Sequence, residues 1–422
     1  MHPVSANAPL LFQRVLSLVL LAAGPLGTTV FAEDWPAHRK DVYRTGITGE
    51  RLMLPLEQVW CKTTSRAPVP AWTESPAIHD YLHNHYHLKP RQHFDRCFDV
   101  AVVGNRVYYG SSVSGAVHCL DATDGGKTLW TFFTEGPVRF TPHVDGGRVY
   151  FGSDDGFVYC LDAVEGTLVW KHRAGPTDEK IWGNEHMISI WPVRTSVTVA
   201  DGEVYWTAGL FPGEGMFLCK RRARDGSGGW TTTPVRPHQG HLALTADWVI
   251  APSGKSFAAV YQRKDGSSAG DLKKSGRDGG CWTLVTPDES QLWTGPSVEN
   301  ATRHFKTSGR TFIALVGGAN TLVANTSFAF YNTDTSILKI EGKKHGLVWR
   351  QDLRYPHALI KAKDHLFAGG DREVASLDAN TGKILWNAEV DGSVYGLAAA
   401  NGALYVSTDR GSIYCFGAPQ KP

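Results

Sequence analysis

The sequence predicts an all-β protein built from repeated four-stranded sheets, and three observations support that prediction. The stretch from Gly147 to Trp170, GRVYFGSDDGFVYCLDAVEGTLVW, reads as three β-branched and aromatic strands separated by two polar turns. Similar stretches recur at 105–130 and 364–386, and the spacing is close to forty residues: Trp130 and Trp170 are 40 residues apart. A single such sheet cannot bury both of its faces, so sheets repeated at this period are expected to stack radially as the blades of a β-propeller.

The repeats account for eight blades. The fourth and fifth blades are degenerate, so a seven-bladed ring, in which those two merge into one, is the alternative. The segment 54–62 resembles the last strand of the other repeats and ends in Trp60, whereas the last repeat stops before such a strand. We therefore expect the N-terminal strand to complete the C-terminal blade and to remove the open edges of the ring. The expected blades are 98–132, 138–173, 194–232, 240–273, 281–316, 320–352, 357–389, and 395–417 joined by 54–62.

The N-terminal end predicts export. Residues 1–32 contain Arg14, an apolar stretch from Val15 to Ala23 and small residues before a cleavage point, as in a secretory signal peptide. An uncleaved anchor is the alternative, but the apolar stretch is short for a membrane span. The domain prediction is a signal peptide at 1–32, a lead-in at 33–53 and the propeller at 54–422. The mature chain would then be periplasmic or extracellular, with no integral membrane span.

Charge and cysteine content narrow the class further. The formal net charge is +2, which gives no reason to expect a nucleic-acid partner. Seven cysteines in an exported chain would normally suggest disulfides. Four of them, however, fall at the same position of different repeats, where they read as small, buried and unpaired core residues. These are Cys119, Cys160, Cys219 and Cys415.

The end of the repeat identifies a family resemblance. Residues 376–386 read SLDANTGKILW. This motif resembles the PQQ-like repeat of the quinoprotein alcohol dehydrogenase-like, eight-bladed β-propellers, a family that also includes BamB-type, non-enzymatic members. The resemblance covers about residues 54–417 and implies that the tryptophan of each repeat docks on the neighbouring blade. The tryptophans at that position are Trp60, Trp130, Trp170, Trp349 and Trp386.

The chain departs from the enzymes of that family. Those dehydrogenases carry two adjacent cysteines over the quinone, and many carry a c-type haem, whereas this sequence has neither a Cys-Cys pair nor a CxxCH motif. No motif matches their carboxylate base or their calcium ligands, so none of those residues is assigned here.

A cationic ring at the mouth of the channel is the first candidate site. Arg139 and Arg194 each lie eleven residues before the tyrosine of their repeat, and His241 and His357 fall close to the same level in their own blades. Converging guanidinium groups would bind a carboxylate-rich ligand, and the tricarboxylate PQQ is one. The alternative is that each arginine pairs with a carboxylate of a neighbouring blade and only fixes geometry.

A histidine-rich stretch and an aromatic stretch are the other candidates. His83, His85 and His87 alternate within 79–93, so in an extended segment they would share one face, as zinc or copper ligands do. A surface lid is the alternative interpretation. The stretch 182–191 contains two tryptophans, a glutamate and a histidine, and could line a ligand pocket or simply pack over the channel.

Two functions follow from these observations. The first is a non-catalytic binding or scaffold module that presents its funnel and loops to a protein partner or a small anionic ligand. The second is a quinoprotein oxidoreductase that binds PQQ with a calcium ion and oxidises an alcohol or a sugar, with Arg139 and Arg194 holding the quinone carboxylates.

Overall fold

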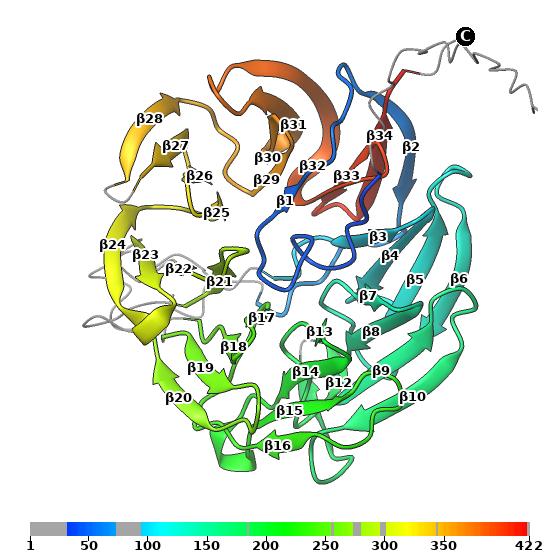
Figure 1. Cartoon of the computed structure of the whole chain (residues 1–422). Coiled ribbons are helices and arrows are strands. Elements are labelled where there is room, and N and C mark those ends of the chain that lie inside the picture. The colour runs from blue at the N-terminus through cyan, green and yellow to red at the C-terminus, as the bar shows by residue number, and fades with distance from the viewer. Residues whose placement is uncertain are drawn as a thin grey trace, which may run out of the picture. The chain divides into compact units, whose positions relative to one another are not determined.

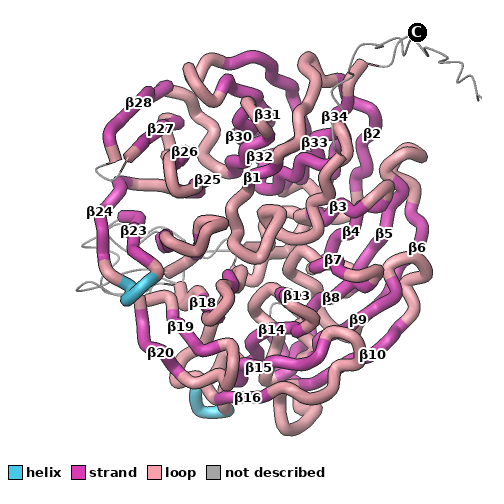
Figure 2. The backbone as a smooth tube through the Cα atoms, viewed as in Figure 1, coloured by secondary structure: helices cyan, strands magenta, loops and turns pink. Residues whose placement is uncertain are grey.

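The computed structural model describes residues 32–72, 94–183, 185–254, 257–272, 280–295, 301–342 and 345–419. Within the unit formed by residues 32–422, the sheets follow one another around a common centre (Figure 1). Figure 2 shows that strands and loops make up nearly all of the described part of this unit, beside the short 3-10 turns Pro212–Glu214 and Ser308–Arg310. No helix in the described ranges is long and apolar enough to cross a membrane.

Six blades are separate four-stranded antiparallel sheets whose strands run outward from the centre in chain order (Figure 1). The first blade contains β3 (Val100–Val103), β4 (Arg106–Ser111), β5 (Ala116–Asp121) and β6 (Thr128–Phe133). The second contains β7 (His143–Asp145), β8 (Arg148–Gly152), β9 (Phe157–Asp162) and β10 (Leu168–Arg173), and the third β13 (Thr198–Ala200), β14 (Glu203–Ala208), β15 (Phe217–Arg222) and β16 (Trp230–Thr232). The hairpin of β11 (Lys180–Gly183) and β12 (His186–Ser189) joins these two blades.

The fourth and fifth blades are distinct sheets, which excludes the seven-bladed alternative. The fourth contains β17 (Ala243–Leu244), β18 (Trp248–Ala251), β19 (Ala259–Gln262) and β20 (Ser268–Asp271). The fifth contains β21 (Trp282–Val285), β22 (Gln291–Gly295), β23 (Ala301–Lys306) and β24 (Phe312–Gly317), and the sixth β25 (Thr321–Ala324), β26 (Phe328–Asn332), β27 (Ile337–Glu341) and β28 (Gly346–Gln351).

The last two blades share one eight-stranded sheet, in the order β1-β29-β30-β31-β32-β33-β34-β2. The 17-residue strand β32 (Ile384–Ala400) is the outer strand of the seventh blade and then the inner strand of the eighth. The remaining strands of this sheet are β1 (Ile47–Thr48), β29 (Ala358–Ala362), β30 (His365–Gly369), β31 (Asp371–Asp378), β33 (Ala403–Thr408), β34 (Ser412–Gly417) and β2 (Glu57–Thr63).

The predicted closure of the ring is confirmed. Strand β2 pairs antiparallel with β34, with Trp60 opposite Cys415. The N-terminal strand therefore supplies the fourth strand of the C-terminal blade, and the chain forms an eight-bladed β-propeller. Because β2 covers the otherwise open edge of β34, neither end of the ring leaves a long unpaired strand.

The segment 33–50, here called the central segment, crosses the middle of the ring and hydrogen-bonds to every blade. Its backbone pairs with inner strands, and its side chains reach the blades that the backbone does not. The contacts, from the first blade to the eighth, are Trp35 with Val102, Pro36 with Val144, Arg44 with Thr198, Val42 with Leu244, Tyr43 with Val285, Arg39 with Thr321, Gly46 with Lys361, and Glu50 with Asn401. A segment of eighteen residues thus ties eight blades together near the centre of the ring.

The hydrophobic core lies between the faces of neighbouring blades. One cluster, for example, combines Tyr108 and Val117 of the first blade with Val149 and Phe151 of the second. The four cysteines at equivalent repeat positions are buried and form no disulfides. Each of the four equivalent thiols fills space in such an inter-blade cluster or beside it, as a small apolar side chain would.

Six junctions between neighbouring blades, here called the Trp junctions, are closed by an indole whose N–H donates to a backbone carbonyl across the junction. Five of these tryptophans are the ones that the repeat motif marks, and Trp230 is the sixth. The donor and acceptor pairs are Trp130 with Ala163 (3.3 Å), Trp170 with Ala223 (2.8 Å), Trp230 with Arg263 (3.1 Å), Trp349 with Ala379 (3.3 Å), Trp386 with Leu56 (2.9 Å) and Trp60 with Ala122 (2.8 Å).

The turn of the repeat explains why its glycine is needed. In the second blade Asp162 accepts hydrogen bonds from the N–H groups of Val164 and Glu165, which folds the turn. Gly166 follows with φ +70°, and a Cβ atom there would lie 2.5 Å from Cδ2 of Trp130. The glycine therefore provides both a left-handed backbone and the space into which the preceding blade's indole inserts.

Candidate functional site

A central cavity of about 440 Å³ lies where the inner strands begin. The central segment contributes His38, Arg39 and Arg44 to its lining, and the blades contribute the residues that precede or open their inner strands. The first, fourth, fifth, sixth, seventh and eighth blades take part, for example through Asp99 and His241. A volume of this size is typical of small-molecule sites.

Two stacked histidines and a carboxylate form the most organised part of this cavity. Nδ1 of His38 lies 2.6 Å from Oδ2 of Asp99, which also accepts a 2.8 Å hydrogen bond from the Thr141 hydroxyl. The His38 ring stacks on His241 with centroids 3.4 Å apart and planes 9° from parallel. Burial, followed by the charge of Arg44, holds the pKa of His38 well below its ordinary value. For His241, burial and then His38 lower the pKa in the same direction, so both imidazoles are neutral at neutral pH.

The protonation state of His38 determines which hydrogen-bonding groups its imidazole can bind. A neutral His38 that donates its Nδ1–H to Asp99 presents an unprotonated Nε2, which is a hydrogen-bond acceptor. Burial also raises the pKa of Asp99, although the Thr141 hydroxyl and neighbouring cations oppose the shift.

The central segment places two arginines beside this pair. The Arg44 guanidinium donates to the carbonyl of Leu242 (2.8 Å) and to the hydroxyl of Thr198 (2.7 Å). The Arg39 guanidinium donates to the carbonyls of Leu322 and Leu359. Burial lowers the pKa of each arginine to about 10, so both remain charged at neutral pH. The central segment therefore adds two positive charges to this side of the cavity.

Arg96, His357 and Tyr395 also line the cavity. Nη1 of Arg96 donates to the Tyr395 hydroxyl (3.0 Å), and its guanidinium carbon lies 5.2 Å from the centroid of that ring. His357 also contacts Tyr395, with ring centroids 4.4 Å apart, and its Nε2 lies 2.6 Å from Asp371. Two members of the predicted cationic ring, His241 and His357, thus line the cavity.

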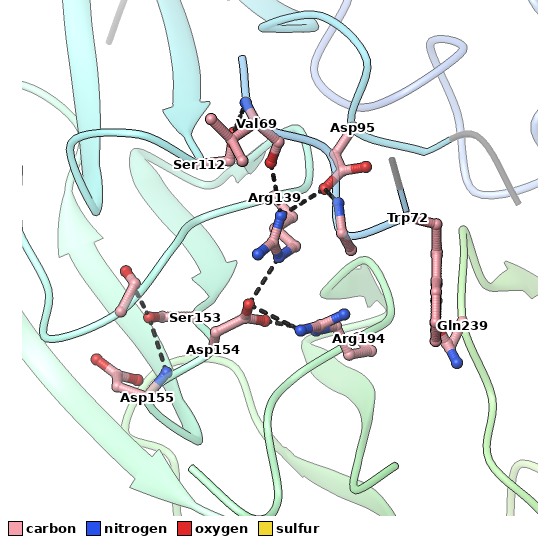
Figure 3. Close-up of polar contacts among 12 residues, drawn as sticks. Val69, Trp72, Asp95, Ser112, Arg139, Ser153, Asp154, Asp155, Arg194 and Gln239 are labelled. Atoms are coloured by element: carbon pink, nitrogen blue, oxygen red, sulfur yellow. Dashed lines mark hydrogen bonds and ion pairs between the residues drawn. The ribbon is translucent and has the colours of Figure 1, made fainter. Parts of the chain in front are cut away.

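The other two members lie elsewhere. Arg139 and Arg194 are almost fully buried and both bind the carboxylate of Asp154, which is also fully buried (Figure 3). Nε of Arg139 lies 2.6 Å from Oδ2 of Asp154, and Nε of Arg194 lies 2.7 Å from Oδ1. Nη1 of Arg139 also binds Asp95 at 2.7 Å. Arg194 thus pairs with a carboxylate of the neighbouring second blade, as the alternative interpretation has it, whereas Arg139 pairs with Asp154 of its own blade and with Asp95 before the first blade.

Arg139 holds the two described ends of the insertion that precedes the first blade. Arg139 donates to the carbonyl of Val69 on one end and to Asp95 on the other, and Asp95 accepts the N–H of Ala71 (Figure 3). Trp72 reaches across to the fourth blade, where its indole donates to Gln239 (2.8 Å). His83, His85 and His87 lie outside the described residues. In the ranges that the structure does describe, His, Cys, Asp and Glu side chains form no group of three that could hold a metal ion.

The aromatic stretch 182–191 divides into two parts. Trp182 is 71% exposed on the β11–β12 hairpin, opposite the exposed Met187. Trp191 is buried, and its indole donates to the carbonyl of Glu214 (2.7 Å). The hairpin therefore presents an apolar pair to solvent, while Trp191 packs beneath it.

Sequence reasoning did not find the cavity residues of the central segment. His38, Arg39 and Arg44 stand outside every repeat, so no repeat position marks them. The only signal is that a segment just before the first strand combines Trp35 with several arginines, a composition that a solvent-exposed linker does not require.

Comparisons with known proteins agree with this architecture. A family model described as outer membrane protein assembly factor BamB matches residues 72–190 and 333–419. The structure of BamB from Moraxella catarrhalis superposes with a TM-score of 0.59 at 15% identity, over 86% of this chain and 99% of that one. The quinohemoprotein alcohol dehydrogenase of Comamonas testosteroni superposes with a TM-score of 0.63 at 14% identity, over 92% of this chain and 81% of that one.

A curated relative shares part of the sequence. Tetrathionate hydrolase of Acidithiobacillus ferrooxidans is 26% identical over 168 residues, which are 37% of this chain and 33% of the relative. The match thus spans about a third of that relative's length.

The fold and its junctions define an eight-bladed β-propeller whose blades are held together by docked indoles. A PQQ-like repeat β-propeller is therefore the fold that these findings support: the BamB family model matches two stretches of the chain, and BamB and the quinohemoprotein alcohol dehydrogenase share its architecture.

Proposed function

We propose that the chain is an exported, non-catalytic binding or scaffold module of the PQQ-like repeat family. The observation that carries this proposal is the pairing of Arg139 and Arg194 with Asp154, and of Arg139 with Asp95. Buried guanidiniums that already bind carboxylates of the protein have no charge left to attract the carboxylates of a quinone. Their role is to join the second and third blades to the insertion at 64–97.

The likeness to BamB and the exposed hairpin favour a protein partner. The matching family is described as an outer membrane protein assembly factor, and that description implies work on other proteins. On this chain the β11–β12 hairpin carries Trp182 and Met187 at the surface, 71% and 47% exposed. Tryptophan and methionine are enriched at protein interfaces. The export that this role requires depends on the predicted signal peptide at 1–32.

A quinoprotein oxidoreductase is the competing function, and the central cavity is the observation that favours it. The cavity has room for a small cofactor, and Arg39, Arg44 and Arg96 make one region of it cationic. Against it, the described residues form no group of three His, Cys, Asp or Glu side chains that could hold a metal ion, and the two arginines predicted to hold the quinone carboxylates do not line the cavity.

Titration with PQQ and calcium separates the two functions. The purified protein is titrated by calorimetry and absorbance, with Arg96→Ala as the variant that changes the cavity and Arg350→Ala as a surface control. We expect no saturable binding at high micromolar PQQ. Micromolar binding that Arg96→Ala weakens and Arg350→Ala leaves unchanged would establish the cofactor site and overturn the scaffold proposal.

A second experiment tests for the protein partner. A photo-crosslinking amino acid is placed at position 182 or 187, and at position 164 as a control of similar exposure on a different turn. We expect a discrete crosslinked protein from positions 182 and 187 that position 164 does not give. Equal labelling from all three positions would show that the hairpin is not the docking surface.

A further inference from the structure

Two of the eight junctions differ from the Trp junctions, and strand register shows where. In the regular blades the docking tryptophan lies opposite a fixed position of the third strand, as Trp130 lies opposite Cys119 and Trp170 opposite Cys160. The same register places Gly270 at the tryptophan position of the fourth blade and Ala314 at that of the fifth. The junctions between blades four and five and between blades five and six are here called the Trp-free junctions.

The residue that faces the missing indole changes as well. In the blades that receive an indole and have a complete third turn, a glycine lies four residues before the tryptophan position, as Gly166 and Gly382 do. At the two Trp-free junctions this glycine is replaced by Arg310 and His345, both of which keep a positive φ, +50° and +53°. A bulky side chain thus stands in the space that the indole leaves.

The two replacements differ in how well they fill that space. Between blades four and five, the Arg310 guanidinium extends over the Trp248 ring at 5.9 Å and donates to the carbonyl of Ala269, beside Gly270. Between blades five and six, His345 does not close the gap. A cleft of about 430 Å³ remains there, lined among others by Trp293, His304, His345 and Phe328.

The polar groups of this cleft are arranged by a short hydrogen-bonded chain. His304 stacks on Trp293, with centroids 3.8 Å apart and planes 5° from parallel. Nε2 of His304 lies 2.9 Å from Oε1 of Gln291 and therefore donates to it, so Nδ1 of His304 accepts from Nε2 of His345 at 3.0 Å. Burial lowers the pKa of His304 to about 3, and both imidazoles are uncharged at neutral pH.

One polar group of the cleft is left over. Trp293 is 98% buried, and its indole Nε1 has no hydrogen-bond partner among the described residues. Trp293 occupies the position that Tyr108 has in the first blade, where the tyrosine hydroxyl donates to the carbonyl of Ala163 across the junction. An unpaired buried N–H costs roughly 1–3 kcal/mol of stability, so an acceptor that reaches this N–H would be bound favourably.

We propose that this cleft is a binding site for a small planar heteroaromatic molecule of about indole size that carries a hydrogen-bond acceptor. The ring lies in the part of the cleft that His345 leaves unfilled, against the side chains of His345 and Phe328. The acceptor receives the Nε1–H of Trp293. The volume lies within the range of small-ligand pockets, and the site is independent of the central cavity.

Two small molecules of similar shape test the hydrogen bond. Benzimidazole has a ring acceptor and indole has none. At pH 8, ligand-observed NMR titration of the intact protein is expected to give saturable binding of both molecules, with benzimidazole about three- to tenfold tighter, as one added hydrogen bond allows. In Trp293→Phe that difference is expected to disappear. No saturable binding of either molecule at millimolar concentration would overturn the proposal.

Filling the cleft from within tests its location. Ala314→Trp with His345→Gly restores the repeat pattern, and its own indole is expected to displace both ligands. Leu315→Trp is the matched control. Leu315 follows Ala314 in the strand, is 54% exposed and points to the other face of the strand. Undiminished benzimidazole binding to a folded Ala314→Trp, His345→Gly variant would overturn the location. If that variant does not fold, His345→Trp replaces it, with the same expected loss.

A third arm separates free ligands from protein-borne ones. A short peptide with one central tryptophan is titrated in the same way. Saturable binding of the peptide that the Ala314→Trp, His345→Gly variant loses, without binding of either free ring, would assign the cleft to a protein partner and overturn the small-molecule proposal.

Discussion

The Trp junctions and the Trp-free junctions fill the space between neighbouring blades with different side chains. At a Trp junction, such as that between blades one and two, an indole, a glycine with positive φ and a backbone carbonyl fit together. At the junction between blades five and six, Ala314 replaces the indole and His345 replaces the glycine, and a cleft lined by Trp293 remains. The comparison shows that the ring tolerates loss of its inter-blade indole where other contacts hold the blades.

The central segment explains that tolerance. It bonds to the inner strand of blade four through Val42, and to that of blade five through Tyr43. The Tyr43 hydroxyl also donates to Glu289, at the turn between β21 and β22, and Glu289 accepts the N–H of Ala246 in blade four. The two degenerate blades are thus linked at their inner ends, and their outer junctions can vary with less effect on the ring.

The largest expected difference comes from removing a docked indole. Trp170→Ala leaves a cavity at the junction between blades two and three and removes the hydrogen bond to Ala223. The expected loss is about 3–5 kcal/mol of unfolding free energy, measured by denaturant titration. Trp182→Ala, at a 71% exposed position, is the control and is expected to stay within about 0.5 kcal/mol. Similar losses in the two variants would refute the idea that indoles hold these junctions together.

The glycine of the turn provides a sharper comparison. Gly166 and Gly342 have nearly the same φ, +70° and +71°, but a Cβ at Gly166 would meet the Trp130 ring at 2.5 Å, whereas a Cβ at Gly342 meets nothing within 4 Å. Gly166→Ala is expected to cost about 2–3 kcal/mol, from backbone strain plus the clash. Gly342→Ala is expected to cost about 1 kcal/mol, from the backbone alone. Equal losses of stability in the two variants, measured by thermal unfolding, would show that the Trp130 indole moves aside to make room for the added methyl group.

These contrasts mark what sequence could and could not predict. The repeat motif fixes the blades, the closing strand and the docked position of tryptophans such as Trp130, because each depends on local pattern and on spacing. The same reasoning left Arg139 open between two interpretations, because the partner carboxylate of Asp95 lies 44 residues away in the chain. The contact of Arg44 with Thr198 spans 154 residues and belongs to no repeat, so only the folded structure brings these two residues together.

The cleft between blades five and six also predicts a pH dependence. The pKa of His304 is lowered to about 3, first by burial and then by His345. In the unfolded chain His304 takes up a proton near pH 6.5, whereas in the folded chain it stays neutral. The free energy of unfolding is therefore highest above pH 6.5 and decreases as the pH falls below that value. His304→Gln should remove up to about 1.4 kcal/mol of the loss seen between pH 8 and pH 5.5. Parallel stability curves for the two proteins over that range would contradict the assignment.

The smallest expected effect concerns the junction between blades four and five. Arg310→Ala removes the guanidinium from the Trp248 ring and from the Ala269 carbonyl but keeps the strained backbone, so the measured change reports the side chain alone. A cation–π contact and one hydrogen bond at a partly exposed site predict a loss of about 1 kcal/mol in denaturant titration. Arg350→Ala, an exposed arginine paired only with Asp352, is expected to change by less than about 0.5 kcal/mol. A loss no greater than that of the control would mean that Arg310 does not replace the missing indole, and that both Trp-free junctions depend on the central segment instead.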